Sequence, residues 1–309
     1  MSPAFEAIEA LATRAPSVET LAVAHGMPVR AFRFGTEDRR APALLVTGGV
    51  HGLERIGTDV AIAYLTTLLA RLSWDAVLRD ALSHTRVLVV PLLNPVGMAR
   101  GQRANGNGVD LMRNAPAAPT GGTPLLGGQQ LSRRLPWYMG APGAPMEPEA
   151  AGLVGFVERE LFDAPLAIAL DLHSGYGFVD RLWYPYARTR EPLPDRPAID
   201  ALARLLDDTL PNHVYRVEQT AQVYTIRGDL WDHVYDRRRD AGDGAILPLT
   251  LEMGSWAWVR KTPLQGLTHL GRVNPVKPPR HRRTLRRHLP LLDFLFHAAA
   301  SHRAWLPTP

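Results

Sequence analysis

Short and almost wholly apolar segments alternate with helix-forming segments along this 309-residue chain. Four of them read as strands: residues 43–47 (ALLVT), 86–93 (RVLVVPLL), 166–172 (LAIALDL) and 245–251 (AILPLTL). Strands with both faces buried show such runs, whereas strands with one face in water alternate apolar and polar residues. Arg181–Tyr184 is a shorter candidate, and we expect helices at residues 58–72, 147–162, 198–210 and 285–300. The order predicts a mostly parallel sheet covered by helices on both faces.

We expect residues 1–309 to form a single domain, because no change in composition marks a boundary and no internal repeat is visible. Segment 115–146 stands out, with six prolines and six glycines in 32 residues and with Trp137 and Tyr138 inside it. A loop of this length is usually a lid or a binding loop, or else it is disordered. Together with the seven tryptophans of the chain, it suggests an apolar or aromatic-lined pocket.

The composition excludes several classes of protein. Cysteine is absent, so the chain has no disulfide framework and no thiolate nucleophile, and a metal site must use His, Asp and Glu. No apolar run reaches the roughly 18 residues that a membrane span needs. The N-terminal residues lack the basic-then-apolar order of a signal peptide. We therefore expect a cytoplasmic enzyme.

The C-terminal part of the chain is strongly basic. Residues 260–303 contain ten Lys or Arg and a single acid, Asp293, in a chain of net charge +5. Such a segment could contact nucleic acid or anionic lipid, and binding of that kind would depend on salt and vanish on removal of residues 280–303. Charge runs are more often solvated helix faces, so we do not expect nucleic acid as a partner. The sequence leaves the oligomeric state open.

Polar side chains that suit a metal site follow three of the predicted strands. His51 and Glu54 come after the first, Asp171 and His173 end the third, and Glu252 follows the last. Because ligands of open α/β sheets bind beyond the carboxyl ends of the strands, we expect these side chains to meet. Two histidines, one carboxylate and a water make a catalytic zinc site. The pattern thus predicts zinc held by His51, Glu54 and His173, with Asp171 as an orienting residue or a strand-end cap.

A second polar group follows the strand at residues 86–93. It comprises Asn94, Pro95 and Gly97, then Arg100, Arg103 and Asn105, and finally Val109–Asn114, which contains Arg113. Three arginines around a loop rich in Gly and Asn can clamp a carboxylate or an oxyanion, because guanidinium offers fixed bidentate donors. A simply hydrated polar loop would have the same composition.

Six motifs in the same order resemble the zinc carboxypeptidase superfamily of the carboxypeptidase A type: HGLE, NPVG, RANGNGVDLMRN, MEPEA, LDLHSG and TLEMG. The resemblance is to a bacterial branch in which an arginine-asparagine pair precedes a VDLNRN-like motif, related also to succinylglutamate desuccinylase and aspartoacylase. It extends from about Ala43 to Trp256. It implies a three-layer α/β/α sandwich around a mixed, mostly parallel, twisted sheet of eight strands, with one zinc ion per chain.

The resemblance also implies roles for individual residues. Glu252 matches the general base and acid that acts on the attacking water. Arg103 is chosen as the arginine that polarises the scissile carbonyl, and Arg100 is the alternate and a substrate-binding candidate. These roles belong to hydrolysis of an amide bond, in which zinc and the arginine stabilise the oxyanion.

Further residues match substrate-binding positions of the family. Arg113 matches the arginine that holds a substrate carboxylate, and Asn105 lies in the same motif. Tyr224, eight residues before Asp232, matches a mobile tyrosine. The chain departs from the family at Met112, where an asparagine is usual, so one donor to the carboxylate is lost. The roughly 60 residues between Arg113 and His173 are also not supplied by the best-known members.

The expected function is a metallocarboxypeptidase acting on peptides or small amino-acid amides. An N-acyl amino acid amidohydrolase of the desuccinylase or aspartoacylase type would use the same zinc ligands, and Met112 favours such substrates. A zinc-binding module without turnover is a third interpretation. It would have no need to keep Glu252 together with the arginine candidates, which argues against it.

Overall fold

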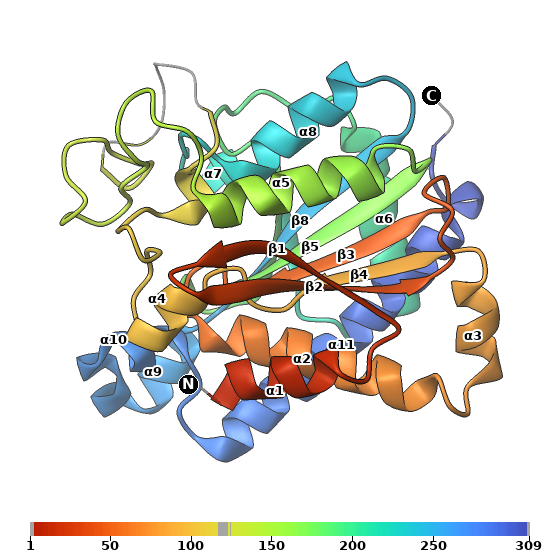
Figure 1. Ribbon diagram of the computed structural model, residues 1–309, viewed down its shortest axis with the longest axis horizontal. Helices are drawn as coiled ribbons and strands as arrows, with labels where there is room; N and C mark the ends of the chain where they lie inside the picture. The colour runs from red at the N-terminus through yellow and green to blue at the C-terminus, as the bar shows by residue number, and fades with distance from the viewer. Residues whose placement is uncertain (1–2, 117–122, 124, 308–309) are drawn as a thin grey trace.

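The architecture, seen in a computed structural model that describes residues 3–116, 123 and 125–307, is a twisted eight-stranded sheet between layers of helices (Figure 1). In spatial order the strands are β1 (Ser17–Ala24), β2 (Met27–Gly35), β4 (Arg86–Val90), β3 (Ala43–Gly48), β5 (Leu166–Ser174), β8 (Ala245–Met253), β6 (Arg181–Tyr184) and β7 (Arg216–Gln219). Strands β4, β3, β5 and β8 run parallel. The pairs β1–β2, β2–β4 and β6–β8 are antiparallel. The predicted mixed α/β/α sandwich is confirmed.

The strands that we expected from apolar runs are present. The structure also contains β1, β2 and β7, whose sequences form no continuous apolar run. Every residue of β3, β4 and β5 is buried, whereas only Ala24 of β1 is. A half-exposed edge strand carries polar residues on its outer face, so its sequence lacks a continuous apolar signal. Strands β1 and β2 are joined by a two-residue turn in which both His25 and Gly26 have positive φ, as hairpins of this length prefer.

The helices form layers on the two faces of the sheet, with α5 and α8 on one face and α1, α2 and α11 on the other (Figure 1). The expected helices correspond to α2, α5, α6 and α11. Helix α11 begins earlier than expected because two prolines occupy its first turn, where their missing N–H groups cost nothing. The helices are α1 (Pro3–Ala12), α2 (Arg55–Arg71), α3 (Ala76–Leu82), α4 (Pro95–Arg100), α5 (Pro148–Leu161), α6 (Arg196–Thr209), α7 (Thr220–Val223), α8 (Leu230–Asp240), α9 (Trp256–Lys261), α10 (His269–Val273) and α11 (Pro278–Ala300), with short 3-10 turns η1 (Leu111–Arg113), η2 (Pro263–Leu267) and η3 (His302–Ala304).

Close backbone packing fixes the loop between β3 and α2. A Cβ atom on Gly57 would lie 2.3 Å from the carbonyl oxygen of Leu172, and one on Gly52 would lie 2.1 Å from the backbone of Gly97. Only glycine allows these approaches, which press the start of α2 against the end of β5. The loop that carries His51 and Glu54 is therefore held directly beside the end of β5.

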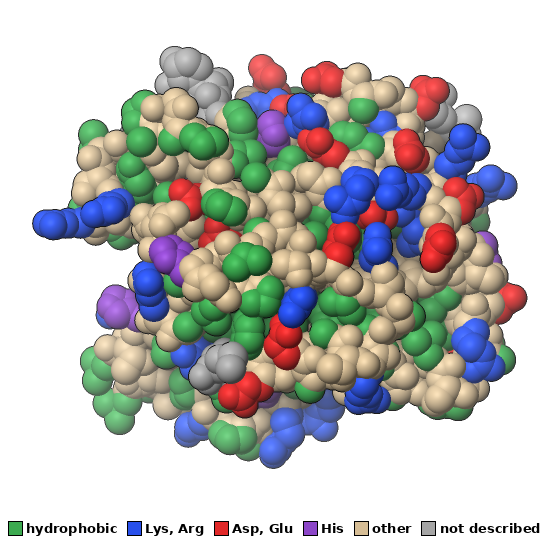
Figure 2. All heavy atoms as spheres, in the orientation of Figure 1, with side chains coloured by type: hydrophobic (Ala, Val, Ile, Leu, Met, Phe, Trp, Pro, Cys, Tyr) green, Lys and Arg blue, Asp and Glu red, His purple; other side chains and the backbone are tan. Residues whose placement is uncertain are grey.

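Two segments flank the carboxyl ends of the central strands, and Figure 2 shows the surface hollowed between them. One is the part of segment 115–146 that the structure describes, in which Gln129 pairs its backbone with Trp137 and Met139. Residues 117–122 and 124 of that segment lie outside the described residues. The other segment is α9–α10. Residues of both segments, which are more than 100 residues apart in the sequence, line the cavity described below.

The basic C-terminal segment packs onto the sheet through one face of α11. The buried residues of α11 are mostly apolar and include Leu292 and Phe296, whereas Arg282, Arg283 and Arg286 are exposed. Among the described residues no single helix is long and apolar enough to cross a membrane. The α2–α3 pair, bent by 108°, passes that test only when both helices are taken together, by length and composition alone.

Candidate active site

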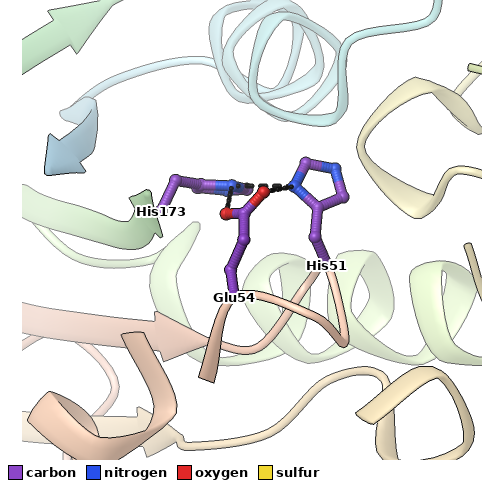
Figure 3. Close-up of side chains that lie close together, drawn as sticks. All are labelled: His51, Glu54 and His173. Atoms are coloured by element: carbon purple, nitrogen blue, oxygen red, sulfur yellow. Dashed lines mark hydrogen bonds and ion pairs between the residues drawn. The ribbon is translucent and has the colours of Figure 1, made fainter. Parts of the chain in front are cut away.

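Three buried side chains converge beyond the carboxyl ends of β3 and β5 (Figure 3). His51 and Glu54 lie in the loop between β3 and α2, and His173 is the penultimate residue of β5. Their ligand atoms all lie within 4.8 Å of one another. Glu54 Oε1 is 2.9 Å from His51 Nδ1, and Glu54 Oε2 is 3.2 Å from His173 Nδ1. The three side chains expected to hold a metal are thus brought together.

Each histidine of this cluster is oriented by a buried aspartate. His51 Nε2 lies 3.0 Å from Asp110 Oδ1, and His173 Nε2 lies 2.8 Å from Asp171 Oδ2. Because these carboxylates only accept hydrogen bonds, each Nε2 carries a proton, and Nδ1 presents a lone pair in the neutral form of each imidazole. Without a metal ion, burial lowers the pKa of His173, but Asp171 and Glu54 outweigh that effect and raise it above its usual value.

The arrangement of lone pairs fits a metal ion. The two Nδ1 atoms of His51 and His173 are only 3.1 Å apart, and both face the carboxylate of Glu54. Two lone pairs at that separation would repel, and a proton or a metal ion between them removes the repulsion. Two imidazole nitrogens with a carboxylate, each histidine held by an outer carboxylate, form a donor set that suits Zn²⁺.

Asp171 is held at three points. It accepts hydrogen bonds from His173, from the hydroxyl of Thr47 at 2.8 Å and from the indole N–H of Trp231 at 2.9 Å. Burial opposes its ionisation, but His173 and these donors outweigh that effect and lower the pKa of Asp171. A fixed anion at this position keeps the imidazole of His173 in one orientation.

Asp110 is the site residue that sequence reasoning did not single out. Besides His51 Nε2, it accepts hydrogen bonds from Arg103 Nε at 2.9 Å and Arg113 Nη1 at 3.0 Å. Burial opposes its ionisation, but the two guanidinium groups hold the pKa of this carboxyl well below its usual range. Its signal in the sequence was its place in the VDLMRN motif, two residues before Met112.

Arg103 and Arg113, which both donate to Asp110, differ in how many of their other donor groups face the cavity. Arg103 also donates from Nη1 to Glu54 Oε1 at 3.3 Å, and 30% of its side chain is exposed at the cavity. Arg113 is 2% exposed. Its Nη1 donates to Asp110 and its Nη2 to the carbonyl oxygen of Leu126 at 3.0 Å. Arg103 therefore has donor capacity directed at the cavity, whereas Arg113 is largely engaged by the protein.

Arg100 and Asn105 are not brought to this cluster. Arg100 is exposed and donates to the carbonyl oxygen of Gly106. Asn105 is 1% exposed, and its side chain donates to Glu147 at 2.8 Å while accepting backbone N–H groups of its own loop. Among the described residues, the lining of the cavity includes neither. Both side chains hold together the loop from which Arg103 projects.

Glu252 lies next to the three-residue cluster on the neighbouring strand. It is the register partner of His173 in the β5–β8 pair, and its Oε1 accepts the backbone N–H of Tyr176 at 2.8 Å. Burial, followed by the charge of Glu54, raises the pKa of Glu252 to about 8. A cation held by Glu54 and the histidines would counter part of that repulsion. A carboxyl that gains and loses a proton near neutral pH suits general acid–base work.

Tyr224 also lines the cavity. Its ring lies 5.9 Å from that of Trp183 and 6.4 Å from that of Tyr176, measured between centroids. Burial raises the pKa of the Tyr224 hydroxyl, so this group is protonated at neutral pH and can donate a hydrogen bond.

The cavity that joins these residues has a volume of about 520 Å³. Its outer end, the metal end, holds the histidines, Glu54, Arg103 and Glu252. Its inner end extends back along β8 to Pro248 and is lined mainly by residues from β6, β8 and the segment from α7 to the start of α8: Trp183, Tyr184, Thr220, Val223, Ile226, Asp229, Trp231, Asp232, Pro248 and Thr250. Leu126, Pro136 and Trp137 of segment 115–146 also contribute. The walls are aromatic in part, as the sequence suggested, but they also include two buried carboxylates.

Residues 5–256 match the zinc carboxypeptidase family model, and the chain belongs to this family. Human carboxypeptidase A5 is 26% identical over 248 residues, covering 71% of this chain and 54% of that protein. Mouse carboxypeptidase A1 is 23% identical over 193 residues, covering 58% of this chain and 43% of that protein. The chain spans about half the length of the curated relatives it matches. The predicted family, a family of zinc-dependent hydrolases, is confirmed.

Solved structures share the fold at low sequence identity. Bovine thrombin-activatable fibrinolysis inhibitor superposes with a TM-score of 0.69 at 16% identity, covering 96% of both chains. A murein-tripeptide amidase from Escherichia coli O157 gives a TM-score of 0.51 at 20% identity, covering 96% of this chain and 94% of that chain. These likenesses agree with the three-layer architecture.

Proposed function

We propose that this protein is a zinc-dependent hydrolase that cleaves amide bonds, as a metallocarboxypeptidase acting on peptides or small amino-acid amides with one zinc ion per chain. The observation that carries the proposal is the arrangement at the metal end of the cavity. Two histidine lone pairs and a carboxylate converge within 4.8 Å, and Glu252 stands beside them on the neighbouring strand.

Side chains of the protein carry out the proton transfer and the oxyanion stabilisation that hydrolysis requires. When bound, the ion supplies Lewis-acid polarisation of a carbonyl and acidifies water. Glu252 takes the proton of the attacking water and returns it to the leaving nitrogen. Arg103 faces the cavity and donates to the oxyanion that forms at the carbonyl, a contribution whose loss typically costs about 100- to 1000-fold in rate. Tyr224, which also lines the cavity, offers a neutral hydroxyl.

The second candidate is an N-acyl amino acid amidohydrolase. It is favoured by Arg113, whose two terminal nitrogens are occupied by Asp110 and Leu126, and by Met112 in place of a second donor. The clamp for a free C-terminal carboxylate is thereby weakened. The structural neighbour named as a murein-tripeptide amidase is consistent with amide substrates other than ordinary peptides. Comparing hydrolysis of N-acyl amino acids with that of unblocked dipeptides separates the two candidates.

The test of the proposal combines metal content with turnover. We expect about one zinc per chain in the wild type by elemental analysis, and its loss in His51→Ala purified without added metal. Glu252→Gln should keep the zinc and lose about 100- to 10,000-fold in kcat, since it removes the proton carrier alone. His84→Ala, which alters an exposed histidine, is the matched control and should change neither.

Two results would contradict the proposal. Full turnover by zinc-loaded Glu252→Gln would show that Glu252 is not the proton carrier. A wild-type protein that takes up no metal even after zinc supplementation would overturn the ligand assignment and favour a scaffold without catalysis.

A further inference from the structure

The turn η2, between α9 and α10, carries two leucines that the protein leaves in water. Leu264 and Leu267 are each 78% exposed. A 3-10 turn has three residues per turn, so side chains three positions apart project from the same side. Figure 2 shows hydrophobic side chains at the corner of the molecule that α9 and α10 form. Large aliphatic side chains exposed together cost free energy in water, and such apolar patches are a feature of surfaces that bind a partner.

The orientation of this turn is fixed from its buried side. Gln265, which lies between the two leucines, is 7% exposed. Its Nε2 donates to the carbonyl oxygens of Gly271 at 2.7 Å and Asn274 at 3.3 Å. Its Oε1 accepts a hydrogen bond from Arg280 Nη1, in the first turn of α11, at 3.3 Å. These bonds tie η2 to α10 and α11, so the leucines are held facing outward.

The segment that contains the leucines is basic throughout. Residues 253–292 include nine Lys or Arg and no Asp or Glu. Arg272 Nε donates to the carbonyl oxygen of Gly266 at 2.8 Å, so a guanidinium group lies directly beside the leucines. Asp59, on the neighbouring helix α2, is bonded to His281 at 2.9 Å. Most of the cations are exposed and form no ion pair with another described residue; they include Lys261, Arg272, Lys277, Arg282 and Arg283.

An exposed aliphatic pair beside unpaired cations matches the surface of an anionic lipid bilayer. Leucine side chains enter the boundary of the acyl chains, while Lys and Arg stay at the level of the phosphates. A nucleic acid offers the same phosphates, but its bases stack on aromatic side chains, and η2 has none. Phe178 and Trp256, exposed near the start of α9, already pack edge to face with centroids 5.6 Å apart. A second copy of the chain would bring like charges together.

We propose that η2 and the basic residues around it dock the protein onto an anionic lipid surface. Leu264 and Leu267 enter the boundary between headgroups and acyl chains, and the cations of α9, α10 and the start of α11 contact the lipid phosphates. The contact is peripheral, since two side chains enter the bilayer and the sheet with its helices stays in water. The inference does not depend on the proposed reaction, because binding to vesicles needs no turnover.

The test is co-sedimentation of the full chain with vesicles of phosphatidylcholine, with and without phosphatidylglycerol. We expect binding to the anionic vesicles that weakens as salt rises, and little binding to the neutral ones. Leu264→Ser combined with Leu267→Ser should lower the affinity for anionic vesicles roughly 10- to 100-fold, because two side chains no longer gain from burial. These substitutions leave the net charge of +5 unchanged, so they do not alter non-specific attraction to the anionic surface.

A second pair of substitutions tests the charges. Arg282→Gln combined with Arg283→Gln should lower the affinity about 5-fold for each charge removed and make binding less sensitive to salt. Arg39→Gln combined with Arg40→Gln removes two exposed arginines from the loop between β2 and β3 and should have a much smaller effect. All four positions are exposed, so the fold is kept, and equal unfolding temperatures check this.

The matched apolar control lies on α3, at the other end of the molecule (Figure 1). Trp74 and Val77 are 69% and 73% exposed, and Trp74→Ser combined with Val77→Ser should leave vesicle binding unchanged. Dependence of binding on this pair instead of the leucines would overturn the inference.

Three further results would also overturn the proposed lipid docking. The first is wild type that does not sediment with anionic vesicles, or a leucine variant that binds them as tightly as wild type. The second is tight binding of a single-stranded oligonucleotide, with no vesicle binding, that needs Arg282 and Arg283 but not the leucines. The third is a dimer in sedimentation equilibrium that the leucine variant loses, again without vesicle binding, which would identify a second copy of the chain as the partner.

Discussion

The two ends of the cavity both contain buried carboxylates, but the protein treats their charges in opposite ways. At the metal end, Asp110 is bonded to His51 and two guanidinium groups, and Asp171 accepts hydrogen bonds from three side chains. At the inner end, Asp229 keeps one oxygen without a partner. Compensated charges hold a geometry, whereas a buried carboxyl without a counter-charge favours its neutral form. We therefore assign the geometry of the proposed reaction to the metal end.

The largest effect on stability is expected at Asp110, whose charge is paired with two guanidinium groups. Asp110→Asn leaves Arg113 buried without its charge partner, which typically costs about 3–5 kcal/mol. Urea unfolding of the zinc-loaded protein measures the loss, with Asp240→Asn as the exposed control. A loss no larger than that of the control would show that the charges of the metal end are not compensated by Asp110.

A smaller effect is expected at the second orienting carboxylate. Asp171→Asn keeps the shape of the side chain but removes the anion that holds the imidazole of His173, so zinc affinity should fall about 10- to 100-fold. Competition with a chelator measures the affinity. Asp163→Asn, at an acid outside the cavity, is the matched control. Unchanged affinity would mean that the strand end alone orients His173.

The smallest effect, of opposite sign, is expected at the inner end. Burial and Asp232 raise the pKa of Asp229 from 3.8 to about 8, so its neutral form is favoured in the folded protein. That contribution is fully present below about pH 4 and is lost as pH rises through about 8. Asp229→Asn should therefore gain stability relative to wild type across this range, by about 1 kcal/mol because the cavity admits water to Oδ2.

The measurement is the difference in unfolding free energy between the two proteins at pH 5 and pH 8, without ligand. If wild type instead became the more stable protein as pH rose, a fixed cation would already compensate Asp229. The contrast between the two ends would then disappear.

The metal end was largely predictable because its residues occupy strand ends. His51, His173 and Glu252 each follow a run of buried apolar residues, and parallel strands bring such positions to one edge of the sheet. Which arginine faces the cavity was less predictable. The path of the loop from Arg100 to Arg113 decides it, and that path depends on contacts such as Asn105 with Glu147.

The inner end shows what the sequence could not reveal. In sequence, Asp229 is an ordinary helix-capping residue, and one of its oxygens does cap α8. That the other oxygen borders a cavity depends on how α7, α8 and β6 pack around it. Strands β1 and β7 were missed for a related reason, since their exposed residues interrupt the apolar pattern on which the other strands were recognised.

The position of β8 in the sheet has a consequence for synthesis on the ribosome. This strand is the last of the eight in sequence, yet it lies between β5 and β6 and joins β6–β7 to the rest of the sheet. It also carries Glu252. A nascent chain that ends before Ala245 already contains all three candidate metal ligands but has neither a continuous sheet nor the proton carrier. The final strand thus completes the sheet and supplies the proposed general base together, so a chain without β8 lacks both.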